Sequence, residues 1–223
     1  MLVNADFSLP VVVTPGQYHW TSSPQGGVER VMLDRIGAEQ ARATSIVRYA
    51  PDSFFPEHAH PGGEEILVLS GVFSDESGDF PAGWYLRSPS GSSHQPFSRE
   101  GALIFVKLRQ MGPDDDCRLR IDTRDPANWE QHGQGVRCPL FSNAHEQVCL
   151  QRLEPGQALP GAWEGGAELL VLEGELLAGG QRCERGSWIR LPAGARPGFT
   201  AGEAGACFYL KTGHLAGMAQ VAQ

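Results

Sequence analysis

Short apolar runs, rich in β-branched and aromatic residues, follow one another along the whole chain. Examples are ARATSIVRYAP at 41–51, EEILVLSGVF at 64–73, GWYLRSP at 83–89 and ALIFVKLRQ at 102–110. Gly, Pro, Ser and Asp interrupt these runs about every 8 to 12 residues, which is typical of a β-sandwich or β-barrel. The one helix-like stretch, GAEQARAT at 37–44, is short. We therefore predict an all-β protein with antiparallel barrels, because closure removes exposed strand edges.

The same pattern occurs twice in the chain. GGEEILVLSG begins at Gly62, and GGAELLVLEG begins at Gly165, 103 positions later. At this offset a second set of landmarks also matches, in which Gly83, Arg87, Pro89 and Gly91 correspond to Gly186, Arg190, Pro192 and Gly194. An internal duplication of this kind predicts two domains, 1–115 and 116–223, connected through the polar, Gly- and Pro-containing segment at 112–127.

Two histidines lie directly before the first of the matching runs, in FFPEHAHPGGEE. His58 and His60 are one residue apart, so on a strand both side chains point to the same face. Glu64 follows a predicted turn, and His94 ends the next predicted hairpin. Three imidazoles and a carboxylate that converge inside a barrel predict a site for one divalent transition metal ion. The alternative is that these are surface histidines or hydrogen-bonded core groups.

The second copy distinguishes Glu64 from its neighbour Glu65. In that copy the counterparts of His58, His60, Glu64 and His94 are Gly161, Trp163, Ala167 and Pro197. Glu65 persists as Glu168, so we predict that Glu64 is the metal ligand and that Glu65 is structural, bonding a turn or Arg87. The interior of the second copy is then expected to be apolar, with three tryptophans in its core: Trp129, Trp163 and Trp188.

The segments HAHPGGEEILVLSG and GWYLRSPSGSSH resemble the two cupin motifs, Gly-x5-His-x-His-x3,4-Glu-x6-Gly and Gly-x5-Pro-x-Gly-x2-His. Asp52 or Ser53 replaces the first glycine of the first motif. The run GGEEILVLSGVFSDESGDFPAGWYLRSPSGSSH is similar to the cupin-like domain of the ChrR family of anti-sigma factors. The resemblance implies two tandem cupin barrels of the double-stranded β-helix, or jelly-roll, type, the second a degraded copy without the ligands.

Members of that family hold zinc with this ligand set, sequester an extracytoplasmic-function sigma factor and release it under singlet-oxygen stress. The resemblance therefore implies one zinc ion per chain and a sensory or regulatory module of the oxidative stress response. In the family, a separate helical domain with a His-x3-Cys-x2-Cys zinc site binds the sigma factor. The chain has no CxxC pair, so we carry over the fold and the metal site but do not expect a sigma factor to bind.

Two functions remain open for the metal site. A closed tetrahedral zinc shell would belong to a sensory or regulatory module with a protein partner. Six-coordinate Fe, Mn or Ni would leave about two positions for substrate and oxygen, as in a cupin dioxygenase that cleaves diketones or aromatics. No ionisable residue flanks His94 in SSHQP, which favours the regulatory function. Tyr49 and Tyr85 are either hydrogen-bond donors for a substrate or packing residues, and SDESGD at 74–79 is expected to be a solvated hairpin turn.

Composition limits the other function classes. Of the 223 residues, 41% are hydrophobic and 20% are charged, as in a globular protein in water. A formal charge of −8 argues against nucleic-acid binding, and no apolar run approaches the roughly 20 residues of a membrane helix. The start MLVNADFSLP lacks the features of a secretory signal, and the five cysteines form no CxxC pair. We expect a cytoplasmic protein with reduced cysteines, no nucleic-acid or membrane partner, and a homodimeric assembly.

Overall fold

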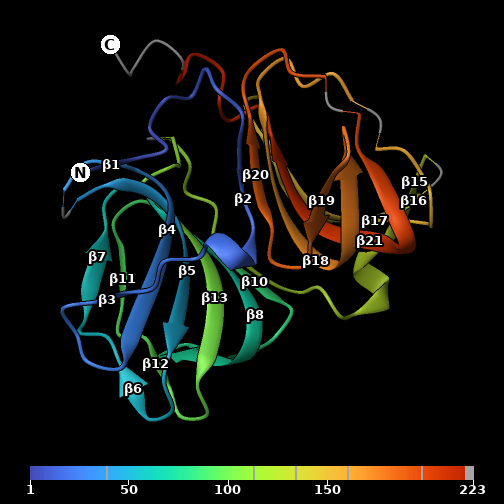
Figure 1. Ribbon diagram of the computed structural model, residues 1–223. Coiled ribbons are helices and arrows are strands. Elements are labelled where there is room, and N and C mark those ends of the chain that lie inside the picture. Colours follow the sequence, from blue (N-terminus) through green and yellow to red (C-terminus); the bar gives the residue numbers. More distant parts are fainter. Residues whose placement is uncertain (39, 113, 134, 160, 197, 219–223) are drawn as a thin grey trace. The chain divides into compact units, whose positions relative to one another are not determined.

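The structure, a computed structural model, describes residues 1–38, 40–112, 114–133, 135–159, 161–196 and 198–218. The chain is almost entirely β and divides into two compact units (Figure 1). Unit 1 comprises Met1–Ala5 and His19–Arg124, and unit 2 comprises Asp6–Tyr18 and Asp125–Gln223. This division differs from the predicted boundary between residues 115 and 116 at two short segments. Asp6–Tyr18 belongs to unit 2, and residues 116–124 belong to unit 1.

Antiparallel strands build unit 1. Its strands are β1 (Leu2–Val3), β3 (Thr21–Ser22), β4 (Val28–Ile36), β5 (Arg42–Tyr49), β6 (Ser53–Phe54), β7 (His58–His60), β8 (Glu64–Asp75), β9 (Gly78–Pro81), β10 (Trp84–Ser88), β11 (Ser92–His94), β12 (Phe97–Ser98), β13 (Ala102–Leu108) and β14 (Leu119–Asp122). The main sheet has the order β1-β4-β5-β13-β8-β10-β14, and β7 pairs with β11 as a separate two-stranded sheet. The helical expectation for 37–44 is wrong from Arg42 onward, because β5 begins there and pairs with both β4 and β13.

Unit 2 repeats this arrangement. Its strands are β2 (Val11–Val13), β15 (Glu130–His132), β16 (Gly135–Ser142), β17 (Gln147–Leu153), β18 (Ala167–Ala178), β19 (Gln181–Glu184), β20 (Trp188–Leu191) and β21 (Thr200–Thr212), with 3-10 turns η1 (Pro15–Gln17) and η2 (Pro126–Asn128). The sheet order is β15-β16-β17-β21-β18-β20-β2. Both units therefore place the long strand of the repeated motif, β8 or β18, between the same two kinds of neighbour.

The duplication extends to backbone detail in the long strands. β8 and β18 have 12 residues each and start 103 positions apart. Gly71 and Gly174 occupy the same point of these strands with φ of 70° and 66°. A Cβ atom at Gly71 would lie 2.0 Å from the carbonyl oxygen of Gly101, and one at Gly174 would lie 2.0 Å from that of Gly205. Only glycine fits both the left-handed conformation and the close backbone approach.

One short strand near the start of each copy pairs in the sheet formed by the other copy. β2 lies in the first copy, yet it pairs with β20 of unit 2. β14 lies in the second copy, yet it pairs with β10 of unit 1. Since β10 and β20 are equivalent strands of the two copies, the exchange is reciprocal. It explains why Asp6–Tyr18 belongs to unit 2 and why unit 1 extends to Arg124.

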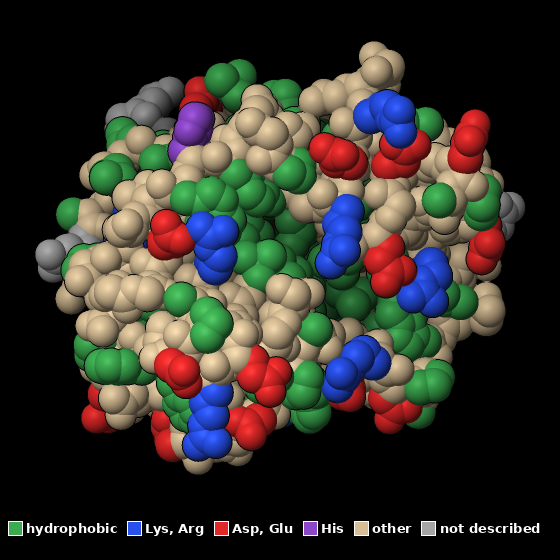
Figure 2. All heavy atoms as spheres, turned by 60° about the horizontal axis from the view of Figure 1, so that its bottom comes forward, with side chains coloured by type: hydrophobic (Ala, Val, Ile, Leu, Met, Phe, Trp, Pro, Cys, Tyr) green, Lys and Arg blue, Asp and Glu red, His purple; other side chains and the backbone are tan. Residues whose placement is uncertain are grey.

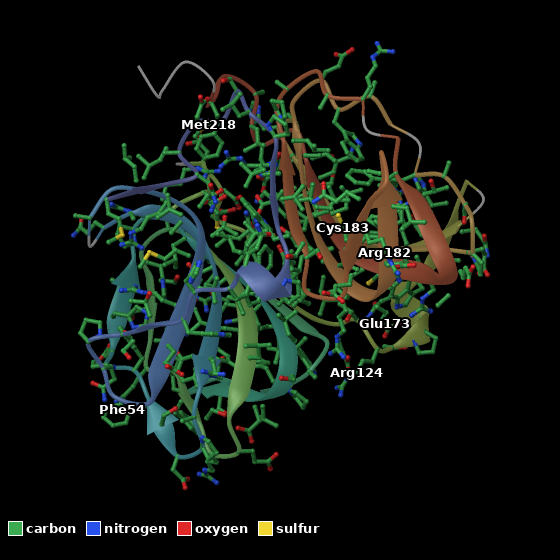
Figure 3. All side chains as sticks on the ribbon, in the orientation of Figure 1. Phe54, Arg124, Glu173, Arg182, Cys183 and Met218 are labelled. Carbon is green, nitrogen blue, oxygen red and sulfur yellow. The ribbon has the colours of Figure 1, made fainter. Side chains whose placement is uncertain are left out.

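Each unit has its own apolar core. The core of unit 1 includes Val28, Ile66, Val68, Phe73, Ile104 and Val106. The core of unit 2 includes Leu169, Val171, Leu176, Ile189, Phe199 and Phe208. Alternate residues of the strands supply many of these side chains, because successive strand residues point to opposite faces of a sheet. Phe54 is 47% exposed and projects from the surface of unit 1 (Figure 3).

The five cysteines are free thiols, and three of them are buried. Cys183 lies inside unit 2 (Figure 3). Burial raises the pKa of Cys138 and that of Cys207 to about 11, and the pKa of Cys149 to about 12. Because the thiolate is the reactive form, these groups are unreactive packing residues near neutral pH, as predicted.

The described part of the chain contains no helix that is long and apolar enough to cross a membrane. On the face drawn in Figure 2, acidic and basic side chains lie interspersed, so neither sign of charge dominates it.

Candidate metal centre

Two short paired strands bring the three histidines together. His58 and His60 are the ends of β7, and β11 pairs with it so that His94 lies opposite His58. The ring centroids are 4.7 Å apart for His58 and His60, 4.7 Å for His60 and His94, and 5.1 Å for His58 and His94. A turn after β7, closed by a bond of 3.1 Å from Gly63 N to His60 O, then brings in Glu64. The four residues offer ligand atoms that all lie within 4.8 Å of one another.

The protonation states suit a cation. Burial lowers the pKa of His60 to about 3, with the charges of His94 and His58 acting in the same direction. Burial also lowers the pKa of His58. These two rings are therefore neutral near pH 7 and offer lone pairs. Burial raises the pKa of Glu64 to about 7 in the absence of an ion, and a bound cation would favour its charged form.

A buried nitrogen gives an independent test of whether the residues fit a metal ion. His60 Nε2 is fully buried and has no hydrogen-bond partner among the described residues. Glu64 Oε2 lies 3.5 Å from it and also 3.5 Å from His94 Nε2. An unpaired buried polar atom destabilises a fold unless something satisfies it. A divalent ion held by His58, His60, Glu64 and His94 would do so, and the donor set of nitrogen and oxygen suits Zn, Fe, Mn or Ni.

Asp75 orients His94. The expectation of a solvated hairpin turn at 74–79 is therefore confirmed for residues 76–79 and wrong for Ser74 and Asp75, which are buried. Asp75 is only 7% exposed, and its Oδ2 lies 3.3 Å from His94 Nδ1. Burial by itself would lower the pKa of His94, but the bond to Asp75 and the charge of Glu64 outweigh it and raise that pKa. A proton on Nδ1 leaves Nε2 free to face Glu64. Carboxylates commonly hold metal-binding histidines in this way.

Glu65 has the structural role predicted for it. Its Oε1 lies 3.0 Å from Arg87 Nη1 and accepts a hydrogen bond of 2.7 Å from the Tyr85 hydroxyl. Tyr85 is therefore bound on the side away from the histidines and is not a substrate donor. In unit 2 the equivalent Glu168 accepts a bond of 2.7 Å from Trp188 Nε1. This buried contact is common to both copies and independent of the ligand set.

The second copy places Trp163 at the backbone position of His60. Gly63 N and Gly91 N both donate to His60 O at 3.1 Å, and the equivalent glycines of unit 2 donate to Trp163 O at 2.9 Å. Trp163 is 9% exposed and Trp188 is fully buried, so both lie in the core as predicted. Trp129 is only half-buried beneath Arg152, so its assignment to the core is wrong. Pro197, the counterpart of His94, lies outside the described residues.

Asp52 stands where the first cupin-type motif has its first glycine. Its φ is 55°, in the left-handed region that glycine adopts most readily. Aspartate is among the few other residues that tolerate this conformation, because its short polar side chain bonds locally. The turn that leads from β5 to β6 is therefore preserved, and its left-handed conformation identifies Asp52, not Ser53, as the counterpart of the glycine.

A cavity of about 340 Å³ opens beside the four candidate ligands, inside unit 1. All four of them line it, as does Tyr49 at the end of β5. Most of the remaining wall is apolar and includes Phe55, Phe73 and Ile104. An ion at this position would therefore face a largely apolar cavity that opens to the surface.

Comparison with known proteins agrees with this architecture. A family model described as the ChrR cupin-like domain matches residues 9–112 and 118–216. The chain belongs to the ChrR cupin-like family. None of the curated proteins compared matches it.

Three solved structures show the same two-barrel fold as this ChrR cupin-like protein. The bacterial pirin YhhW of Escherichia coli, in complex with nickel(II), is 10% identical with a TM-score of 0.68, over 92% of this chain and 98% of that one. Protein YlbA of Escherichia coli is 15% identical with a TM-score of 0.68, over 93% and 92%. An oxalate decarboxylase of Bacillus subtilis with Mn(II) centres is 12% identical with a TM-score of 0.61, over 91% and 76%. At these identities the likeness concerns the fold alone.

Two residues of the ChrR cupin-like site, Asp75 and Arg30, are not predicted from the sequence. Asp75 lies in a run of acids and glycines that is indistinguishable from an exposed turn. Arg30 lines the cavity from β4, two residues after Val28, which also lines it. The alternation along VERVMLDRI puts Arg30 on the same face as Val28. That signal was present in the sequence, but the face of β4 that points inward was not known.

Proposed function

We propose that unit 1 binds one divalent transition metal ion through His58, His60, Glu64 and His94. We further propose that the protein is a metal-dependent enzyme of the oxygenase type acting on a small organic molecule. The observation that carries this proposal is the cavity of about 340 Å³ lined by the same four residues. A closed structural zinc site keeps no open position, whereas a catalytic site needs one beside a space for substrate.

The residues have distinct roles in this proposal. A bound divalent ion would supply Lewis-acid activation of a coordinated substrate. Neutral His58 and His60 offer nitrogen lone pairs, and Glu64 supplies the negative charge that balances part of the ion's charge. Asp75 holds the proton of His94 on Nδ1 so that Nε2 points at the centre. The largely apolar wall lowers the local dielectric, which strengthens the electrostatic interactions beside it.

The kind of ion is part of the proposal. Zinc follows from the ChrR resemblance, whereas Fe, Mn and Ni follow from the need for open coordination positions. The nickel(II) in the pirin structure and the Mn(II) centres of the oxalate decarboxylase support a metal ion in this fold without naming the one held here. The second barrel, which lacks the ligand set, is proposed to be a scaffold.

Metal analysis and coordination spectroscopy on protein purified without added metal test the proposal. We expect one ion per chain with a coordinated water, and oxygen consumption with a diketone or catechol substrate. His60→Ala should lose the ion, and the exposed His145→Ala, in unit 2, should keep it. A four-coordinate, water-free zinc shell with no turnover would contradict the enzymatic function.

A regulatory module is the second candidate, favoured by the match of the ChrR cupin-like family to both copies. In that case the ion would stabilise unit 1. Singlet oxygen would oxidise one of the metal-binding side chains, the ion would dissociate, and a protein partner would detect the resulting change in unit 1. Illumination with a photosensitiser should then release the metal in step with histidine oxidation. Co-purification would identify the partner, and we do not expect a sigma factor.

A further inference from the structure

Arg30 brings a positive charge into the largely apolar wall of the unit 1 cavity. It lies on β4, pairs with Val47 of β5, and lines the cavity together with Val47. Its strand neighbour Glu29 faces the other way and forms an exposed ion pair with Arg48, at 2.6 Å. β4 therefore places Glu29 on the outer face and Arg30 on the inner face.

The protein itself supplies little to balance Arg30. Its Nε is buried and has no hydrogen-bond partner among the described residues. Another cation lies within reach of its charge, since burial and then Arg30 lower the pKa of Arg35. Arg30 is half-buried, and its Nε has lost contact with water without gaining an acceptor, which no stabilising role in the fold accounts for.

The charges around the cavity favour an anion. Among the described lining residues, Glu64 is the one acid, and it belongs to the proposed metal site. Arg109 is a second lining arginine, and its Nε and Nη1 donate to the carbonyls of Pro61 and Gln40 at 2.8 and 2.7 Å. Arg109 thus holds the rim of the cavity, while Arg30 presents its charge to the interior. This contrasts with the chain as a whole, which carries a formal charge of −8.

We propose that Arg30 binds the carboxylate of a small, mostly apolar monocarboxylic acid, whose other end reaches the proposed metal site. A guanidinium matches a carboxylate with two parallel hydrogen bonds, and the match is strongest in a site that excludes water. The apolar wall, which includes Val28, Val47, Ile104 and Val106, would cover the rest of the molecule. A volume of 340 Å³ is near the lower end of small-molecule sites, roughly 300 to 1,000 Å³, so one ring or a short chain fits. The contact between this ligand and the metal site rests on the proposed function.

Matched acids and amides test the proposal by calorimetric titration. The probes are benzoate against benzamide and hexanoate against hexanamide, added to the full chain both metal-free and loaded with zinc. We expect each acid to bind about 10- to 100-fold more tightly than its amide, the range for hydrogen bonds to a charged group. Arg30→Gln should remove this preference, and Arg30→Lys should keep part of it.

Arg48→Gln is the matched control, because it removes the same charge from the outer face of the neighbouring strand. It should leave the preference unchanged. Equal binding of acids and amides, no binding of either acid at millimolar concentration, or an unchanged preference in Arg30→Gln would each overturn the proposal. In the last case the carboxylate binds the metal instead. Metal content separates the role of Arg30 from that of the metal site, since Arg30→Gln should hold as much zinc as the wild type. The titration of metal-free protein tests Arg30 even if no metal binds.

Discussion

At the scale of single residues, neighbouring carboxylates in unit 1 have unlike tasks because a strand turns alternate side chains to opposite faces. Glu64 faces three imidazoles, whereas Glu65 faces Arg87 and Tyr85. The second copy keeps the contact of Glu65 and lacks the ligand set of Glu64. The two positions can therefore be tested separately.

Glu64→Gln should weaken metal binding, whereas Glu65→Gln should lower the stability of the fold. We expect Glu64→Gln to weaken metal binding by more than about 100-fold, since even outer-shell changes cost 10- to 100-fold. Metal-free Glu64→Gln should fold normally, because burial already favours the neutral form of this side chain. Glu65→Gln should keep the metal and lose about 1.5 to 3 kcal/mol of unfolding free energy, because Arg87 loses one of its two acidic partners and keeps Asp115. Metal analysis measures the bound ion, and urea unfolding measures the stability. Loss of the metal from Glu65→Gln but not from Glu64→Gln would contradict Glu64 as the ligand.

Asp75→Asn should weaken metal binding about 10- to 100-fold while leaving the four ligands in place. The amide accepts the His94 proton less strongly, so the ring is held less firmly with Nε2 toward the centre. Competition with a chromogenic chelator gives the affinity. Asp79→Asn, in the same hairpin but exposed, is the control and should bind metal like the wild type. Equal losses in both variants would show that hairpin stability, not His94 orientation, is responsible.

At the scale of elements, the long strands β8 and β18 depend on one glycine each. The left-handed backbone at Gly71 lets the strand pass within contact of the Gly101 carbonyl. β8 supplies Glu64 at its start and Asp75 at its end, so its path positions both ends of the candidate site. A change at Gly71 therefore acts on the strand as a whole.

Gly71→Ala should destabilise unit 1 by roughly 3 to 5 kcal/mol, combining left-handed strain with a clash against backbone. Gly91→Ala is the control, because Gly91 has φ of 82° but no atom within 4 Å of an added Cβ. It should cost about 1 to 2 kcal/mol, the strain alone. Thermal unfolding measures the difference. Similar losses of stability in the two variants would mean that the backbone around Gly71 can move away from an added Cβ without an energetic cost.

At the scale of the whole molecule, one barrel carries the ligand set and the other has an apolar core in its place. Each nevertheless contains one short strand, β14 or β2, from the other copy. Metal binding should stabilise the unit that holds the ion, because a ligand of the native state shifts its unfolding equilibrium by mass action.

Removing the metal with a chelator should lower the unfolding temperature of unit 1 and leave that of unit 2 nearly unchanged. At a free metal concentration 100 times the dissociation constant, the stabilisation is about 2.7 kcal/mol. Scanning calorimetry with and without zinc resolves the two transitions. In His60→Ala the chelator should have no effect. An equal shift of both transitions would contradict a site confined to unit 1.

The homodimer stays a prediction that rests on symmetry alone. We expect light scattering after size exclusion to give twice the mass of 24.1 kDa. A mass that corresponds to one chain at micromolar concentration would contradict it. Metal-free protein is the control, because the predicted assembly does not depend on the ion.

The sequence by itself determined the all-β class, the duplication and the four candidate ligands. These features are local: strand alternation, glycines in left-handed turns and the His-x-His spacing depend on residues close together in the chain. Only the tertiary structure decided that β2 and β14 exchange units, that Asp75 orients His94 and that Arg30 enters the cavity. Each of these depends on contacts between segments far apart in sequence, and no local pattern specifies which distant strand or side chain will be the partner.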